Sequence, residues 1–143
     1  MIKITNKTHY ALRFLIHVAE VYPGGHLSIA EVASKENISE KFLESIVSQL
    51  KSKGLVRAKR GAGGGYLLSL PPSHISLFQV IEAVESETPG MSDEATSDTH
   101  TAYIIRNQIA ELDKIMTQYL KSRTLADLQQ EYDQLQAGQM FYI

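Results

Sequence analysis

The chain has 143 residues, 43% of them hydrophobic and 21% charged, and this length suits one domain with an appended oligomerisation segment. Cysteine is absent, which excludes a disulfide framework, a thiolate zinc site, a nucleophilic thiol and a cysteine-ligated iron–sulfur cluster. The formal net charge of −2 is unevenly divided: residues 1–70 hold ten Lys or Arg against five Glu, a net of +5, and the remainder carries −7.

The first predicted element is a helix over residues 7–22. Its apolar residues recur at intervals of three and four, the period of a helix with one buried face. That face holds Tyr10, Ala11, Phe14, Leu15, Val18 and Tyr22. Lys7 and Arg13 stay outside it, and Pro23 with the two glycines after it ends the helix.

Two capped helices come next. Ser28 and Glu31 have the spacing of a capping box, in which each side chain satisfies a backbone amide at the helix start, so we expect a helix over Ile29–Glu36. The turn after it provides a second N-cap at Ser39. A second helix is expected from there over residues 39–53.

The second helix has two contrasting faces. One is an apolar stripe formed by Leu43, Ile46, Val47 and Leu50, with Phe42 on its flank. At about 100° per residue, the opposite face holds Lys41, Glu44, Ser45, Ser48 and Ser52. Gly54 ends the helix as the residue best able to adopt a left-handed C′ conformation.

A glycine-tipped basic hairpin follows. Residues 55–60 and 66–70 have the pattern of two strands, joined by the glycine-rich residues 61–65. A phosphate-cradling loop would need a helix after the glycines, but the second strand ends at Pro71-Pro72, through which no helix continues. The hairpin is therefore interpreted as a wing, with Arg57, Lys59 and Arg60 on it.

These parts indicate a winged helix-turn-helix that binds DNA. The major groove admits a helix, and a thin glycine tip can approach a phosphate or the minor groove. The charge division favours nucleic acid contact by the first half only. From the exposed faces we expect DNA contacts from Lys7, Ser45, Ser48, Lys59, Gly63 and Gly64. The alternatives are a winged-helix module for protein contacts without a DNA target, and a non-specific architectural DNA binder.

The chain then leaves the winged helix. Ser76 and Gln79 form another capping box, and the helix they begin closes a first domain over residues 1–86. Residues 87–100 are rich in Ser, Thr, Asp, Glu, Pro and Gly, which predicts a loop or linker. The C-terminal segment spans residues 101–143.

A long helix is expected over residues 101–123. Its main apolar positions, separated by 4, 3, 4 and 3 residues, are Ile105, Ile109, Leu112, Met116 and Tyr119. Such a pattern over about 30 Å requires a partner helix, and we favour dimerisation over packing on the chain's own domain. A dimer would present two recognition helices to palindromic half-sites.

A last helix is expected from Thr124 to about Leu135, with Gly138 beyond its end. The chain then finishes in an apolar segment. Phe141, Tyr142 and Ile143 either pack onto the body of the protein or act as a docking peptide for a partner.

Catalysis and metal binding find no support in the sequence. There is no G-x-S-x-G elbow and no paired acid with a placed base. His9 and His17 are about 12 Å apart along a helix, too far to share one metal ion, so neither a metal nor another cofactor is expected. No apolar run reaches membrane-spanning length and no signal peptide is recognisable, so we expect no membrane partner and a cytoplasmic location.

The sequence resembles the Rrf family of bacterial winged-helix transcription regulators. The resemblance is carried by Tyr10 in its helix, by Ser39-Glu-Lys-Phe-Leu-Glu44, Gly54-Leu-Val, Arg60-Gly-Ala-Gly-Gly-Gly-Tyr66 and residues 75–85. It implies a homodimeric repressor that binds operator DNA through residues 39–53 and the wing, with contacts from Tyr10, Ser39, Lys41 and Arg60. The expected fold is mainly α, with a small β-hairpin wing and a long C-terminal dimerisation helix.

The family's cluster-binding members place three cysteines in the segment equivalent to residues 87–100, and this chain has none. It is therefore most similar to the family's clusterless cysteine-metabolism repressors, a likeness that Thr124, Leu128 and the apolar ending reinforce. This resemblance implies control of cysteine metabolism genes. It also implies a cysteine synthase, O-acetylserine thiol-lyase, as a partner, with Phe141, Tyr142 and Ile143 as the docking peptide.

Overall fold

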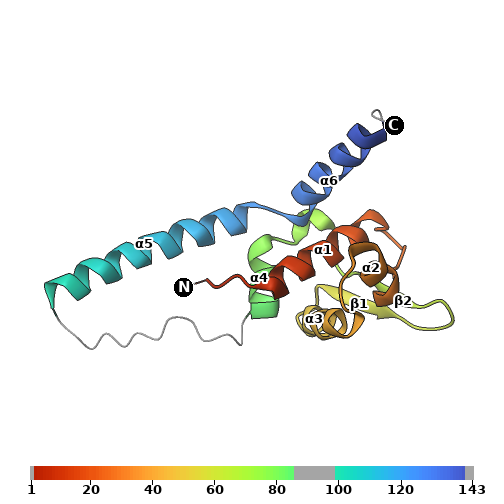
Figure 1. Ribbon diagram of the computed structural model, residues 1–143, viewed down its shortest axis with the longest axis horizontal. Coiled ribbons are helices and arrows are strands. Elements are labelled where there is room, and N and C mark those ends of the chain that lie inside the picture. Colours follow the sequence, from red (N-terminus) through yellow and green to blue (C-terminus); the bar gives the residue numbers. More distant parts are fainter. Residues whose placement is uncertain (1, 86–98, 141–143) are drawn as a thin grey trace.

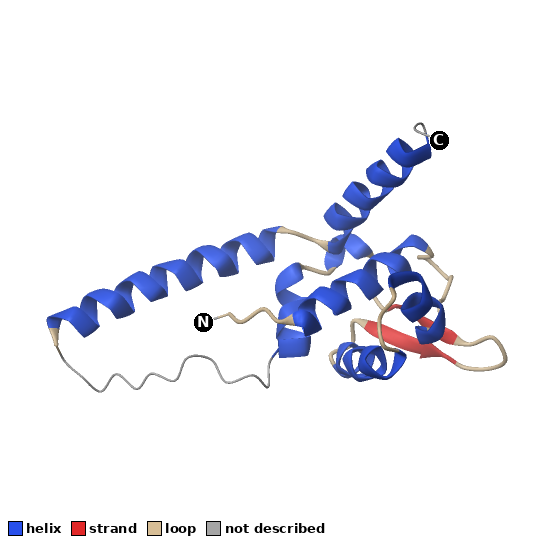
Figure 2. Ribbon diagram, in the orientation of Figure 1, coloured by secondary structure: helices blue, strands red, loops and turns tan. Residues whose placement is uncertain are grey.

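The computed structural model describes residues 2–85 and 99–140, and side chains up to residue 138. Within these ranges the protein is mainly helical, with one two-stranded antiparallel hairpin (Figure 2). No helix in the described parts of the chain is long and apolar enough to cross a membrane.

Three helices form the first half of the fold: α1 (Asn6–Glu20), α2 (Ile29–Glu36) and α3 (Glu40–Ser52). Each begins at a side-chain cap, with Thr5 accepting from the backbone amide two residues later and Ser28 and Ser39 from the amide three residues later. Between α2 and α3, Asn37 adopts a left-handed conformation, which lets the chain turn within three residues.

The hairpin consists of β1 (Val56–Lys59) and β2 (Gly65–Leu68), and their register pairs Val56 with Leu68 and Lys59 with Gly65. A bridge between Leu27 and Tyr66 extends the pairing, since each donates its amide to the other's carbonyl oxygen, at 3.0 and 2.7 Å. The base of the hairpin is thereby fixed to the segment that precedes α2.

A 3₁₀ turn, η1 (Pro72–His74), leads into α4 (Leu77–Glu85). The C-terminal part forms α5 (His100–Ser122) and α6 (Leu125–Met140). In Figure 1, α5 extends away from the body of the molecule, and α6 returns against α1 before its end projects outward.

The main core lies between α1, α3, α4 and the hairpin. Its largest fully buried side chains include Phe14, Leu43, Leu50 and Leu68, and Leu125 of α6 lies among them with no exposed surface. A smaller cluster joins Leu77, Ile81 and Leu120 where α4 meets α5. The first turn of α6 is therefore part of the core beneath the helix-turn-helix.

The expected fold class is confirmed, and most predicted boundaries agree within two residues. One prediction was wrong: α6 does not end near Leu135 but continues through Gly138 to Met140. A single glycine among good helix formers costs only about 1 kcal/mol, which does not stop a helix. The predicted linker falls almost wholly on residues 86–98, and the tail on 141–143, both outside the described residues. The division at residue 86 stays a prediction.

Candidate DNA-binding surface

The outer face of α3 is exposed as its sequence pattern predicts. Lys41, Ser45 and Ser48 are not buried, while Leu43, Ile46, Val47 and Leu50 on the opposite side are. Ser39 is also exposed, and its side-chain oxygen is engaged in accepting from the amide of Phe42 at 3.3 Å. The Lys41 ammonium and the serine hydroxyls on this face can reach base edges and phosphate oxygens, and Glu44 is exposed on the same face.

An aromatic contact joins α1 to the first turn of α3. The rings of Tyr10 and Phe42 meet edge to face, with centroids 5.5 Å apart and planes at 89°. Phe42 is 38% exposed, more than its predicted place on the flank of the apolar stripe suggested. The structure therefore brings Tyr10, which is half-buried, together with α3, and adds Phe42 to the candidate surface.

The wing presents its basic residues beside this helix. Lys59 and Arg60 are exposed, and the turn after them depends on Gly61 and Gly63, whose φ values of +110° and +73° are unfavourable for other residues. Gly64 is required for another reason, since a Cβ there would lie 2.4 Å from the carbonyl oxygen of Lys59. The glycines keep the turn thin, so that its backbone can approach a nucleic acid backbone.

A carboxylate fixes the start of α1. Glu85, at the end of α4, accepts from the hydroxyls of Thr5 and Thr8 at 2.8 Å each, and from the amide of Thr5. Burial alone would raise the pKa of the Glu85 carboxyl, but these hydrogen bonds and the charge of Lys7 outweigh burial and hold that pKa below its ordinary value. Lys7, one of the predicted contacts, therefore extends from an anchored first turn and is half-buried.

The predicted dimerisation stripe on α5 is unevenly exposed. Ile105, Leu112 and Tyr119 are 56%, 49% and 59% exposed, whereas Ile109 and Met116 are half-buried. Two further apolar side chains, Ile104 and Ile115, lie on the exposed side at 56% and 60%. With Tyr103, which is 61% exposed, six large apolar side chains along this helix are left about half exposed or more by the described part of the chain.

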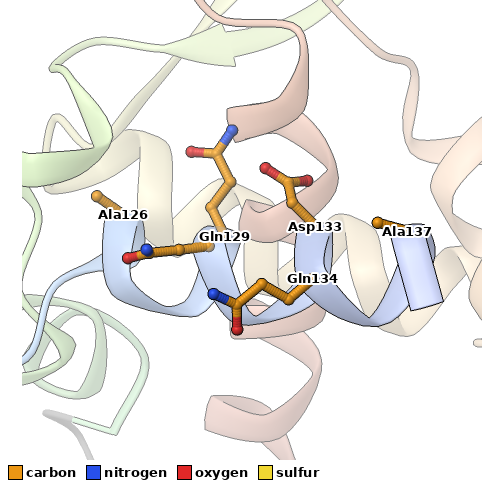
Figure 3. A pocket seen from close by; sticks show the side chains of 6 residues that line it. Ala126, Gln129, Asp133, Gln134 and Ala137 are labelled. Carbon is orange, nitrogen blue, oxygen red and sulfur yellow. The ribbon is translucent and has the colours of Figure 1, made fainter.

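A hollow also lies away from this surface. A groove of about 580 Å³ follows α6 between Ala126 and Ala137, and Figure 3 shows the side chains of Asp133 and Gln134 along it. None of the predicted contact residues lines this groove. In the described ranges, no three or more His, Asp or Glu side chains are grouped to hold a metal ion.

Comparisons with known proteins agree with this geometry. The family model described as Rrf2, iron-dependent transcriptional regulator, matches residues 4–131. The chain is 35% identical to the HTH-type transcriptional regulator CymR of Bacillus subtilis, over 99% of both proteins. The solved structure of CymR, described as the global cysteine regulator of B. subtilis, superposes with a TM-score of 0.77 at 34% identity, covering 92% of this chain and 98% of CymR. The structure of T. potens IscR also gives 0.77, at 27% identity, covering 94% and 90%.

The iron dependence in the family's description does not fit the donor set of this chain. A cysteine-ligated cluster needs thiolates, and the sequence contains no cysteine. What the chain shares with these relatives is the helix-turn-helix, the wing and the long helix.

Proposed function

The chain belongs to the Rrf2 family of transcriptional regulators, and on that basis we propose that it is a homodimeric repressor that binds a specific operator sequence. The observation that carries this proposal is the shared surface of α1, α3 and the wing. There, Lys41, Ser45 and Ser48 lie on the outer side of α3, which contacts the basic hairpin, and Tyr10 meets Phe42 in the first turn of the same helix.

In this proposal α3 lies in the major groove and the wing touches the backbone or the minor groove. Lys7, Lys59 and Arg60 neutralise phosphates, and the backbone at Gly63 and Gly64 allows close approach. Ser39, Lys41, Ser45 and Ser48 lie within reach of base edges from the helix face. Tyr10 adds a contact from α1.

The homodimer is proposed from the exposed face of α5. Ile105, Leu112 and Tyr119 repeat every seven residues, which is the spacing of a seam between two packed helices. Ile115 adds to the same face. A second copy is the occupant that a symmetric interface favours, since the same stripe is then buried on both chains.

The regulated genes are proposed from similarity. CymR is described as a global cysteine regulator, and the alignment with it spans 99% of both chains, so we assign genes of cysteine metabolism as targets. We also propose a cysteine synthase as the partner that binds Phe141, Tyr142 and Ile143. Deletion of these three residues should weaken binding to the synthase and leave DNA binding intact, and equal binding by the truncated chain would contradict this.

Genomic-site selection with the purified protein tests the proposed function. Fragmented DNA from the source genome is incubated with the protein, recovered and sequenced, with and without cysteine synthase. The proposal expects one palindromic sequence to be enriched upstream of cysteine metabolism genes. A protein-interaction module would enrich no DNA, and an architectural DNA binder would recover DNA without a preferred sequence.

A further inference from the structure

Two side chains of α1 converge on Glu36, the last residue of α2. Arg13 donates from Nε to Glu36 Oε1 at 2.7 Å, and from its terminal nitrogen to the backbone oxygen of Glu36 at 2.6 Å. His17 Nε2 lies 2.8 Å from the second carboxylate oxygen, Oε2. Both oxygens of Glu36 and the backbone oxygen at the end of α2 are thereby bound from α1.

The position of Glu36 in the chain gives these bonds a specific effect. Asn37 turns the backbone with a φ of +55°, and Ser39 then caps α3, so only three residues separate Glu36 from the proposed recognition helix. The cation of Arg13 at the C-terminal end of α2 also interacts favourably with the helix dipole. The turn between α2 and α3 is consequently held against α1.

The same cluster contacts the proposed DNA surface on one side and α6 on the other. The guanidinium carbon of Arg13 lies 5.5 Å from the centre of the Tyr10 ring, and Tyr10 meets Phe42 of α3 edge to face. The ring of His17, which is almost fully buried, meets Tyr132 of α6 edge to face at 5.7 Å. The contacts run without a break from α6, through α1, to the first turn of α3.

Glu36 stays charged in this setting. Burial alone would raise the pKa of its carboxyl, but the hydrogen bonds and charges of His17 and Arg13 outweigh burial, and the net shift of the Glu36 pKa is downward. By simple electrostatics, a carboxylate in the cationic half of the chain opposes the approach of DNA.

We propose that Arg13, His17 and Glu36 are positioning residues for DNA binding, which act through Tyr10 and the first turn of α3. The proposal rests on the DNA contacts assigned above. By holding the α2–α3 turn and the Tyr10 ring in place before DNA arrives, the cluster removes an ordering cost from the binding step. Arg13 is suited to this role because its planar fork spans a carboxylate and a carbonyl oxygen together.

The first test asks whether replacing Glu36 by Gln raises or lowers the affinity for the operator. Glu36→Gln removes a negative charge, so electrostatics alone predicts equal or tighter binding to the selected operator. The positioning role instead predicts binding weaker by about tenfold, the size expected for one hydrogen bond to a charged group. Glu82→Gln, on an exposed position of α4, is the matched control and should bind no more weakly than the wild type.

The second test asks whether Glu36 acts through Tyr10. In a double-mutant cycle on operator affinity, Glu36→Gln and Tyr10→Leu should be clearly non-additive, while Glu36→Gln and Lys59→Ala should be additive. Arg13→Lys, which keeps the charge but loses the fork, should weaken binding nearly as much as Arg13→Ala. All affinities are measured below the start of each variant's thermal unfolding, so that loss of the fold does not contribute.

The outcomes separate this proposal from the proposed function. If Glu36→Gln binds as tightly as the wild type or tighter, or if its effect simply adds to that of Tyr10→Leu, the positioning role is overturned. In that case Lys41→Ala still weakens binding and the DNA-binding role stands. If the wild type selects no operator, the proposed function fails, and the positioning role fails with it.

Discussion

The backbone amide of Leu125 donates to the carbonyl oxygen of Ile75 at 2.8 Å. A second bond, from Leu77 to the oxygen of Arg123 at 2.9 Å, completes a short antiparallel bridge between the start of α4 and the turn from α5 to α6. Together with the burial of Leu125, this bridge fixes the C-terminal end of α5 to the winged helix. In a dimer formed through α5, the two recognition helices would therefore stand at a set separation, which is what fixed half-site spacing requires.

The exposed stripe on α5 gives the first prediction. Leu112→Glu places a charge in the middle of the proposed interface, where it would lose its hydration on association. We expect the variant to sediment as a monomer at micromolar concentration and to keep the helical content of the wild type. Leu135→Glu, which changes a 69% exposed leucine on α6, is the control and should remain dimeric. Equal dimerisation of both variants would contradict the assignment.

The second prediction concerns the direct contacts. Lys41→Ala and Arg60→Ala should each weaken operator binding by about tenfold and reduce the slope of log affinity against log salt by about 1 if each meets a phosphate. Both side chains are exposed, so the midpoint of thermal unfolding should change little. The measurement is a salt titration of affinity by fluorescence anisotropy. Unchanged affinity in both variants would rule out the assigned contacts.

The wing glycines give the third prediction. Gly64→Ala places a Cβ 2.4 Å from the carbonyl oxygen of Lys59, so the turn must open and DNA binding should weaken several-fold. Gly138→Ala is the matched control, because the added Cβ meets nothing outside its own helical turn within 4 Å in the described part of the chain, and the residue is inside α6. It should raise the free energy of unfolding by up to about 1 kcal/mol and leave affinity unchanged. If Gly64→Ala and the wild type bound the operator with equal affinity, DNA binding would not depend on the geometry of the wing turn.

The Glu85 carboxylate gives a prediction on pH. Its pKa is lower in the folded chain than its ordinary value of 4.5, so ionised Glu85 stabilises the fold above that pH, and the contribution is lost as pH falls through the lowered pKa. The difference in free energy of unfolding between wild type and Glu85→Gln should therefore be constant well above pH 4.5 and shrink as the pH falls below it. Urea unfolding across this range measures it. If the difference in free energy of unfolding did not change with pH, the charge of the Glu85 carboxylate would not be what stabilises the fold.

Local signals in the sequence were sufficient for most elements. The capping boxes predicted at Ser28 and Ser76 are present as hydrogen bonds in the structure, each with its partner three residues later. These patterns succeed because the interacting groups lie within one helical turn of each other. The polar face of α3 was predictable for the same reason, since helix geometry alone separates its two sides.

Contacts between distant residues were not predictable in this way. Glu85 reaches Thr5 across 80 residues, and Glu36 reaches Arg13 and His17 across 23 and 19, with no spacing rule to indicate either pairing. The sequence also did not show which apolar side chains of α5 remain exposed. Ile105 and Ile109 fit the same helical period, and only the folded structure shows that Ile105 is the more exposed of the two.

The most direct test of the whole account is the affinity of the purified full chain for its selected operator, measured between about 50 and 200 mM salt. A cationic surface that neutralises phosphates on two half-sites predicts tight binding at low salt and a loss of at least about a thousandfold over that range. An unrelated duplex of equal length should bind much more weakly throughout. Failure to bind any duplex, at any salt concentration, would contradict the account.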